Sequence, residues 1–270
     1  MTHTAFAIGA HPDDIEFMMA GTLILLKSAG YEIHYMNVAD GCCGTAVYSR
    51  QQIVRIRRKE AQSASMLIGA TYHHSLVPDL DVFYDKKTLA KLAAVVREVS
   101  PEILLVPSPQ DYMEDHSNTA RLAVSAAFTR GMRNFPTSPK RPPITTPCAV
   151  YHALPYGLRD GLSQRIWAGQ YVDVSSVIEQ KQKMLLCHAS QSDWLDKSQG
   201  LGSYAKTMVD MCGEVGKMSG KFSQAEGWRR HNPLGFGAED FDPLSAALGK
   251  KVVVDAEYQM DAKRRNGSGV

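Results

Sequence analysis

Four side chains able to bind a metal or move a proton lie close together near the start of the chain. His11, Asp13, Asp14 and Glu16 directly follow a short apolar run over residues 5–10, which has the composition of a buried strand. Because a strand normally ends in turn residues, an imidazole and three carboxylates at this point indicate a ligand site. These side chains suit a hard or borderline divalent cation.

His11 and Asp14 have the spacing that two ligands of one metal ion need. Residues three positions apart share a face when the chain enters a helix directly after the strand. Pro12 places the helix start after His11, because proline disfavours helical backbone angles at the preceding residue. Asp13 would point elsewhere and could take a proton from a water that zinc has activated. The alternative role for Asp13 is to cap the helix that follows.

A second group of acidic and imidazole side chains follows another apolar strand, predicted over residues 102–107. The loop after this strand reads SPQDYMEDHSN over residues 108–118. The carboxyl ends of parallel strands share one edge of a sheet, so His116 is expected to complete a three-ligand site with an open position, the arrangement of catalytic zinc. Asp115 either orients a ligand imidazole or is a solvated acid at a helix start.

The elements that must position these groups alternate between strand and helix. Strands are expected at 5–10, 31–39, 72–77 and 102–107, and helices at 17–29, 51–68, 87–99 and 118–128. This alternation predicts an α/β fold with a Rossmann-like, mostly parallel sheet and helices on both faces. No GxGxxG follows the first strand, which argues against a dinucleotide site.

A single α/β domain is expected over residues 1–250, followed by a C-terminal tail at 251–270. Within the domain, a Rossmann-like core at 1–130 and a proline-rich loop at 131–149 precede a C-terminal part at 150–250. This last part should add strand and helical elaboration, with a strand at 149–154 and helices at 174–188 and 204–218.

Composition excludes some partners. Of the 270 residues 44% are hydrophobic and 21% charged, and the net charge of +2 is too small to indicate nucleic acid or a membrane surface. No apolar stretch approaches the roughly 18 residues of a membrane span, and no secretory signal is visible. Five cysteines without CxxC spacing indicate reduced thiols, so a cytoplasmic protein is expected.

The two motifs together resemble the PIG-L/LmbE-like family of zinc-dependent N-acetylglucosaminyl deacetylases. The resemblance rests on AHPDD at 10–14 and DH at 115–116, with supporting matches DG at 40–41, RRKE at 57–60, HASQ at 188–191 and AEGWR at 225–229. It implies that His11, Asp14 and His116 bind zinc and that Asp13 is the general base. It also implies a Rossmann-like fold and a homo-oligomer, a trimer or hexamer.

One position departs from the family's pattern. Members commonly carry a histidine three residues before the ligand histidine, where it stabilises the tetrahedral intermediate, but this chain has Met113. His188 is the first candidate substitute, because the apolar stripe of the helix expected at 174–188 continues through it and turns it inward. A core histidine satisfied by a backbone carbonyl is an equal alternative for His188. Tyr112 is the second candidate donor.

Other polar side chains are candidates for positioning the site or binding substrate. Arg57 and Glu60 interrupt the apolar stripe of the helix expected at 51–68, so they should be buried and paired, for instance with each other. Trp228 and Arg229 could stack on and hydrogen-bond a sugar. The full set of expected positioning or substrate residues is Asp115, Arg57, Glu60, Tyr112, Asn118, Glu226 and Arg229.

The predicted function is hydrolysis of a linear C–N amide bond, deacylating an N-acyl (by family default N-acetyl) amino sugar or related conjugate. Zn²⁺ is the expected cofactor, and Fe²⁺ or another divalent metal suits the same ligands. One alternative is a metal-dependent phosphoesterase, against which the single full ligand set argues. The other is a non-catalytic sugar- or metal-binding protein, against which the retained Asp13 argues.

Overall fold

The fold is built around a sheet of eight strands in the order β3-β2-β1-β4-β5-β7-β6-β8. The structure is a computed structural model that describes residues 3–192 and 204–258. The strands are β1 Thr4–Gly9, β2 Glu32–Asn37, β3 Thr71–His73, β4 Ile103–Val106, β5 Ala149–Ala153, β6 Gln170–Asp173, β7 Ala225–Arg230 and β8 Val252–Val254. The pairs from β3 across to β5 are parallel, and β7, β6 and β8 continue the sheet in antiparallel pairs.

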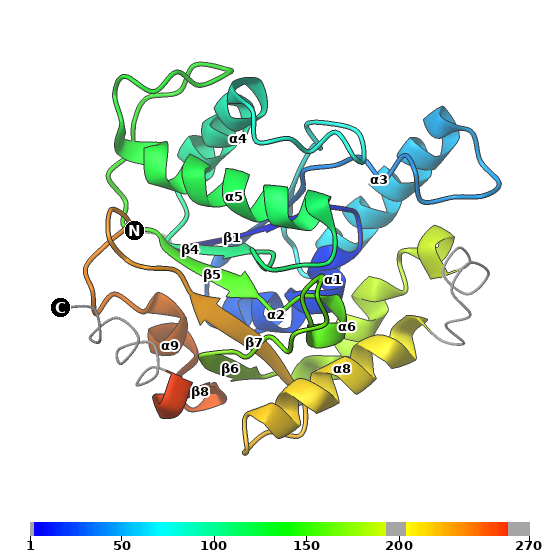
Figure 1. Ribbon diagram of the computed structural model, residues 1–270, viewed down its shortest axis with the longest axis vertical. Helices are drawn as coiled ribbons and strands as arrows, with labels where there is room; N and C mark the ends of the chain where they lie inside the picture. Colours follow the sequence, from blue (N-terminus) through cyan, green and yellow to red (C-terminus); the bar gives the residue numbers. More distant parts are fainter. Residues whose placement is uncertain (1–2, 193–203, 259–270) are drawn as a thin grey trace.

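Helices cover both faces of this sheet (Figure 1). They are α1 Asp14–Met18, α2 Ala20–Ser28, α3 Arg50–Met66, α4 Lys86–Val99, α5 Glu114–Phe128, α6 Ile178–Leu185, α8 Tyr204–Met218 and α9 Pro243–Leu248. Helices α4 and α5 lie on one side, and α2, α6 and α8 lie on the other. The predicted α/β fold with a mostly parallel, Rossmann-like sheet is therefore confirmed.

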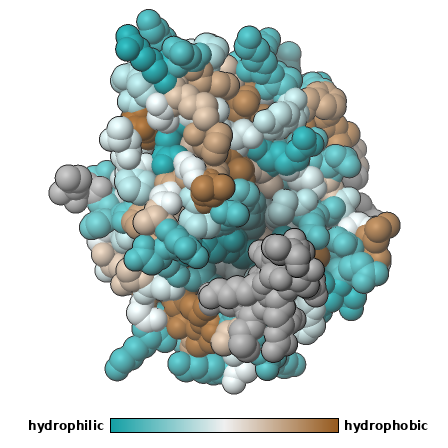
Figure 2. Space-filling model, turned by 60° about the vertical axis from the view of Figure 1, so that its left-hand side comes forward, coloured by the Kyte–Doolittle hydropathy of each residue, from teal (hydrophilic) through white to brown (hydrophobic). Residues whose placement is uncertain are grey.

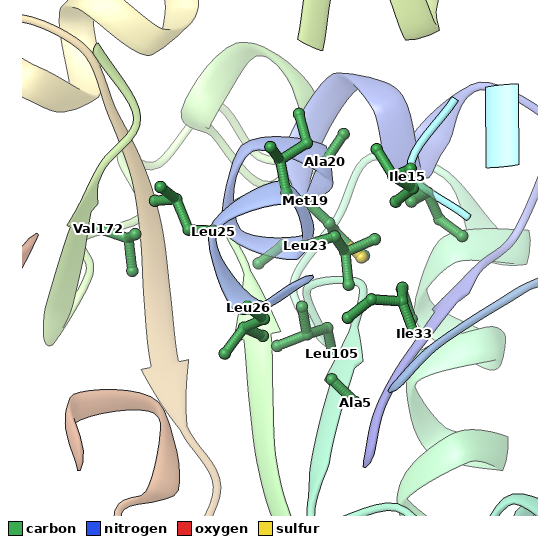
Figure 3. Close-up of a cluster of buried hydrophobic side chains, with 14 of the residues drawn as sticks. Ala5, Ile15, Met19, Ala20, Leu23, Leu25, Leu26, Ile33, Leu105 and Val172 are labelled. Carbon is green, nitrogen blue, oxygen red and sulfur yellow. The ribbon is translucent and has the colours of Figure 1, made fainter. Parts of the chain in front are cut away.

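The first strand shows how the two cores form. Every residue of β1 is buried, and its side chains alternate between the faces because the side-chain period of a strand is two. Ala5 and Ala7 join the core under α2 and α8, where Leu23, Leu26, Ile33 and Leu105 also meet (Figure 3). Phe6 and Ile8 join the core under α4 and α5.

Several element boundaries differ from those predicted. The helix expected at 17–29 is two helices, α1 and α2, separated by Met19 with φ −134°. Helix α5 begins at Glu114 rather than at 118, which places His116 in its first turn. The strand expected at 72–77 shortens to β3, and the helix expected at 174–188 contributes only α6 as α-helix, because β6 extends to Asp173 and a 3₁₀ turn follows.

Strands β6, β7 and β8 and helix α9 were not predicted. The sequence of β7, AEGWRR, lacks an alternating apolar pattern, but β5 and β6 flank it and its first four residues are buried. Strand β8 lies inside the segment expected as a tail and pairs with β6, whereas residues 259–270 lie outside the described part of the chain.

No helix in the described ranges has both the length and the apolar composition to cross a membrane. On the face drawn in Figure 2, hydrophobic residues lie in small groups among hydrophilic ones, as is ordinary for a protein surface.

Candidate metal centre

Three potential metal ligands meet where β1 and β4 end. His11 follows β1, Asp14 opens α1, and His116 lies in the first turn of α5 after β4. One nitrogen or oxygen atom from each of the three lies within 4.8 Å of the others. His116 Nε2 is 3.4 Å from Asp14 Oδ1, and His11 Nδ1 is 3.9 Å from Asp14 Oδ2. The structure thus brings together the three predicted ligands at the edge of a parallel sheet where ligands usually bind.

Two further carboxylates hold the imidazoles from behind. Asp115 Oδ2 lies 2.9 Å from His11 Nε2, and Asp111 Oδ1 lies 3.1 Å from His116 Nδ1. If each carboxylate accepts the imidazole N–H, the other nitrogen of each ring keeps a lone pair directed toward Asp14. Carboxylates orient metal-binding histidines in this way, so Asp115 has the orienting position considered from the sequence.

The charges of the cluster also fit a cation. Asp14 accepts hydrogen bonds of 2.8 Å from the backbone N–H groups of Ala10 and His11. Burial opposes its charge, but His116 and His11 together hold the pKa of Asp14 well below its usual range. Burial likewise opposes a charge on His116, yet Asp14 and Asp111 raise its pKa well above the usual value. The site needs a positive charge, which a proton on His116 or a bound divalent metal would supply.

Asp13 lies beside this cluster in an unusual backbone conformation. Its φ is 121°, a region that residues other than glycine rarely occupy, and such strain is concentrated at functional sites. Its side chain forms no capping hydrogen bond to α1, so the capping alternative does not hold. Tyr204 donates a 2.7 Å hydrogen bond to Asp13 Oδ2, and Arg57 Nη2 lies 3.4 Å away. Burial raises the pKa of Asp13, and Arg57 opposes that rise.

Arg57 and Glu60 are not paired with each other. Arg57 faces Asp13 and also donates to the backbone carbonyls of Pro12 and Gly41. Glu60 accepts hydrogen bonds from the backbone N–H and hydroxyl of Ser190, at 2.8 and 2.7 Å. The two residues thus contact different segments. Arg57 contacts the loops around the site, and Glu60 contacts the chain after α6.

His188 does not reach the pocket described below. Its side chain is fully buried, and its Nε2 lies 3.2 Å from Glu16 Oε2, which also accepts a 3.0 Å hydrogen bond from Tyr35. Burial opposes a charge on His188, but Glu16 and Asp13 together raise its pKa. His188 is buried as expected, but it follows the end of α6 at Leu185 and faces a buried carboxylate instead of the reacting groups.

The segment AEGWR serves the core rather than a ligand. Trp228 is fully buried and donates through Nε1 to Thr22 Oγ1 at 3.1 Å, so it cannot stack on a sugar. Glu226 lies 2.6 Å from Lys181 Nζ and accepts from two backbone N–H groups at the start of α2. Arg229 donates to Ser108 and Gln110 and so braces the loop after β4.

A pocket of about 310 Å³ opens over the candidate metal centre. Its lining includes the three ligands with Asp13, Arg57 and Asp111, together with Tyr112 and Met113, whereas Asn118 on α5 is not part of it. Lining residues that sequence reasoning did not single out include Phe17, Tyr156 and Tyr204. Tyr204 entered the sequence analysis only as the first residue of the helix expected at 204–218, and Asp111 only as part of a loop. Two signals were available in the sequence: Asp111 follows the same strand as His116, and Tyr204 carries a polar hydroxyl on a helix face that is otherwise apolar.

Comparisons with known proteins agree with this geometry. Residues 6–127 match the sequence model of the family described as PIG-L: GlcNAc-PI de-N-acetylase. The chain is 26% identical over 191 residues to diacetylchitobiose deacetylase of Thermococcus kodakarensis, covering 68% of each protein. It is 27% identical over 197 residues to 4-oxalmesaconate hydratase of Pseudomonas putida, covering 70% of this chain and 74% of that protein.

Solved structures show the same fold. N,N'-diacetylchitobiose deacetylase of Pyrococcus horikoshii superimposes with a TM-score of 0.70 at 24% identity, covering 89% of this chain and 88% of that one. The 4-carboxy-2-hydroxymuconate hydratase GalB of Pseudomonas putida gives a TM-score of 0.69 at 22% identity, covering 85% and 96%. Residues 6–127 thus match the PIG-L family, and the solved structures share the fold of the chain.

Proposed function

We propose that this protein is a metal-dependent hydrolase that removes the acyl group, by family default acetyl, from an N-acyl amino sugar or a related conjugate. The observation that carries the proposal is the convergence of His11, Asp14 and His116 next to Asp13. The carboxylate of Asp13 lines the same pocket and makes no capping hydrogen bond to α1. The family match and the diacetylchitobiose deacetylase relative support the choice of reaction.

A divalent metal, Zn²⁺ by family resemblance, fits the two imidazoles and one carboxylate, and when bound it would supply Lewis acidity that polarises the acyl carbonyl and acidifies water. Asp13 takes the proton from the attacking water and delivers it to the leaving amine. Arg57 and Tyr204 fix the direction of its carboxylate, since both contact Asp13 Oδ2. The products are a carboxylate and a free amine.

Tyr112 is the proposed donor to the oxyanion, because Met113 has no N–H or O–H to offer. Its ring packs edge-on against His116 with ring centroids 5.9 Å apart, and its side chain lines the pocket. Although about half of the side chain is exposed, partial burial together with the charges of Asp14 and Asp111 raises the pKa of Tyr112 above its ordinary value, so its hydroxyl keeps its proton and can donate it in a hydrogen bond. His188 lacks this access.

Pocket charge favours the deacylase over the hydratase reaction of the second relative. The hydratases are named for carboxylated muconate and mesaconate compounds, which are anions. Among the lining residues that the structure describes, Arg57 is the one Lys or Arg, and it is already bound to Asp13 and two carbonyls. Asp13, Asp14, Asp79 and Asp111 line the same pocket. A neutral N-acyl sugar therefore fits this field better than a polycarboxylate.

The test combines metal content with acetate release from a panel of N-acetylated sugars and conjugates. We expect about one divalent metal per chain. In Asp13→Asn the metal should remain while kcat falls by about 10²–10⁴-fold, because general acid–base catalysis contributes that much. Acetate release that is unchanged in Asp13→Asn, or a wild-type chain that binds no divalent metal, would contradict the proposal.

A further inference from the structure

Four aromatic rings form a continuous arc along one side of the pocket. The aromatic arc consists of Tyr204, Phe17, Tyr156 and Tyr112, all of which line the cavity. Successive ring centroids are 5.4, 5.2 and 6.3 Å apart. The arc begins at the tyrosine that holds Asp13 and ends against His116. Both ends of the arc therefore contact residues of the candidate site.

The arc has a fixed inner part and an accessible outer part. Phe17 and Tyr204 are 6% and 4% exposed, and the core holds them in place. Tyr112 is 52% exposed, and Tyr156 is partly buried, so both present ring surface to the pocket. Methionines 18, 19 and 113 line the pocket next to the rings, and their flexible thioethers adapt to the shape of an apolar ligand.

The polar lining residues away from the metal centre are largely occupied by the protein itself. Ser108 Oγ donates to Gln110 and accepts from Arg229, and Gln191 donates to the carbonyl of Gly44. Both oxygens of Asp79 accept backbone N–H groups. A second sugar ring would bring several hydroxyls and find few free partners among these described residues, and each buried hydroxyl left unpaired costs affinity.

We propose that the aromatic arc is a subsite for an aromatic group that the substrate carries close to its N-acyl group, such as the aglycone of an N-acetylglucosaminide. This inference rests on the proposed function and names its substrate class. A flat ring can stack or pack edge-on against Tyr156 and Tyr112 and needs no hydrogen-bond partner. Burial of its apolar surface strengthens binding, whereas a hydroxylated ring would leave hydroxyl groups without hydrogen-bond partners and bind more weakly.

The test compares the benzyl and methyl glycosides of N-acetylglucosamine. We expect the wild type to show a kcat/KM about tenfold or more higher for the benzyl glycoside, since a buried phenyl ring gains about that much. Tyr156→Ala should reduce the preference to about threefold or less with little change in the methyl glycoside, and Tyr156→Phe should retain it because the ring remains. Tyr48→Ala, which removes an exposed tyrosine outside the lining, is the matched control and should change neither substrate.

A binding measurement separates the subsite from the reaction. Calorimetry on the Asp13→Asn protein measures the affinity for each glycoside in the absence of turnover. Tighter benzyl binding that Tyr156→Ala abolishes supports the subsite even if no acetate is ever released, an outcome in which the proposed function fails alone. Equal binding and equal turnover of the two glycosides, or a benzyl preference that survives Tyr156→Ala, would overturn the subsite while leaving the hydrolase intact.

Discussion

Two clusters of charged side chains in this protein use similar residue types with opposite outcomes. In the closed cluster, Lys181 and Glu226 have side chains 0% and 2% exposed, and their charges neutralise each other at 2.6 Å. Backbone N–H groups of α2 satisfy Glu226 further. In the open cluster around Asp14 and His116, several carboxylates face a pocket whose described lining contains a single Lys or Arg side chain, Arg57.

The difference lies in charge balance rather than burial. A buried carboxylate with an ammonium and two N–H donors has its hydrogen-bonding capacity used, so it is a structural element. Carboxylates whose negative charge is left uncompensated, with imidazole lone pairs directed at the same point, need a cation from outside. This balance distinguishes Glu226 from Asp14, although both had been candidates for the same site.

The largest effect is expected from a substitution that disrupts the closed cluster. Glu226→Ala leaves Lys181 buried without its counter-charge and should lower the free energy of unfolding by about 3–5 kcal/mol. Urea unfolding measures this loss. The control is Glu214→Ala, which removes an exposed pair with Arg165 and should cost about 1 kcal/mol or less. Equal losses in the two variants would show that burial does not set the value of the pair.

A smaller effect is expected from weakening the open cluster. Asp115→Asn and Asp111→Asn keep the shape of the side chain but no longer hold the imidazoles of His11 and His116 as strongly. Metal affinity should fall by about 10–100-fold in each variant, measured by competition with a chelator of known affinity. Glu114→Gln, an exposed neighbour on the same turn of α5, should leave affinity unchanged. An equal loss in Glu114→Gln would point to general electrostatics instead.

The smallest effect concerns a buried histidine that has no carboxylate partner among the residues described by the structure. His152 contacts the carbonyl of Pro107 and the ring of His231, and burial lowers its pKa from 6.5 to about 4. In His188, by contrast, Glu16 raises the pKa. Below about pH 6.5 the unfolded chain binds a proton at residue 152 that the folded chain does not bind, so stability falls as the pH drops toward 4.

This single group should remove about 2 kcal/mol of stability between pH 7 and pH 5. His152→Asn, which can still donate to the carbonyl of Pro107, should flatten the pH dependence of unfolding by that amount. Urea titrations at pH 7, 6 and 5 on both proteins measure the difference. If the free energy of unfolding of the variant depended on pH as steeply as that of the wild type, His152 would have to be protonated in the folded protein. A histidine paired with a carboxylate would behave in that way.

Sequence patterns predicted the parallel half of the sheet and the convergence of His11, Asp14 and His116 for a common physical reason. Apolar runs identify buried parallel strands, and such strands end at one edge, so polar residues that follow β1 and β4 must meet. Strand β7 and the partners of Glu60 and His188 could not be predicted, because they depend on contacts between segments that lie far apart in the sequence. Trp228 was misread because its burial comes from such packing.

Met113 shows another limit. The missing donor is visible in the sequence, but the substitute depends on which side chain reaches the pocket, and a helical stripe gives only the direction of His188. The structure separates the two candidates by access, since Tyr112 lines the cavity and His188 does not.

The backbone of Asp13 is strained at the residue proposed as the general base. A φ of 121° costs a residue other than glycine about 1–3 kcal/mol, and glycine escapes that cost. Arg57 would keep its two carbonyl partners in Asp13→Gly, so much of the local structure would survive the change. Glycine would, however, leave the buried Arg57 without its counter-charge and Tyr204 without its acceptor, so the strain at residue 13 is released only by giving up both contacts. Engineers who seek a more durable form of this protein should hold residue 13 constant and look for stability elsewhere.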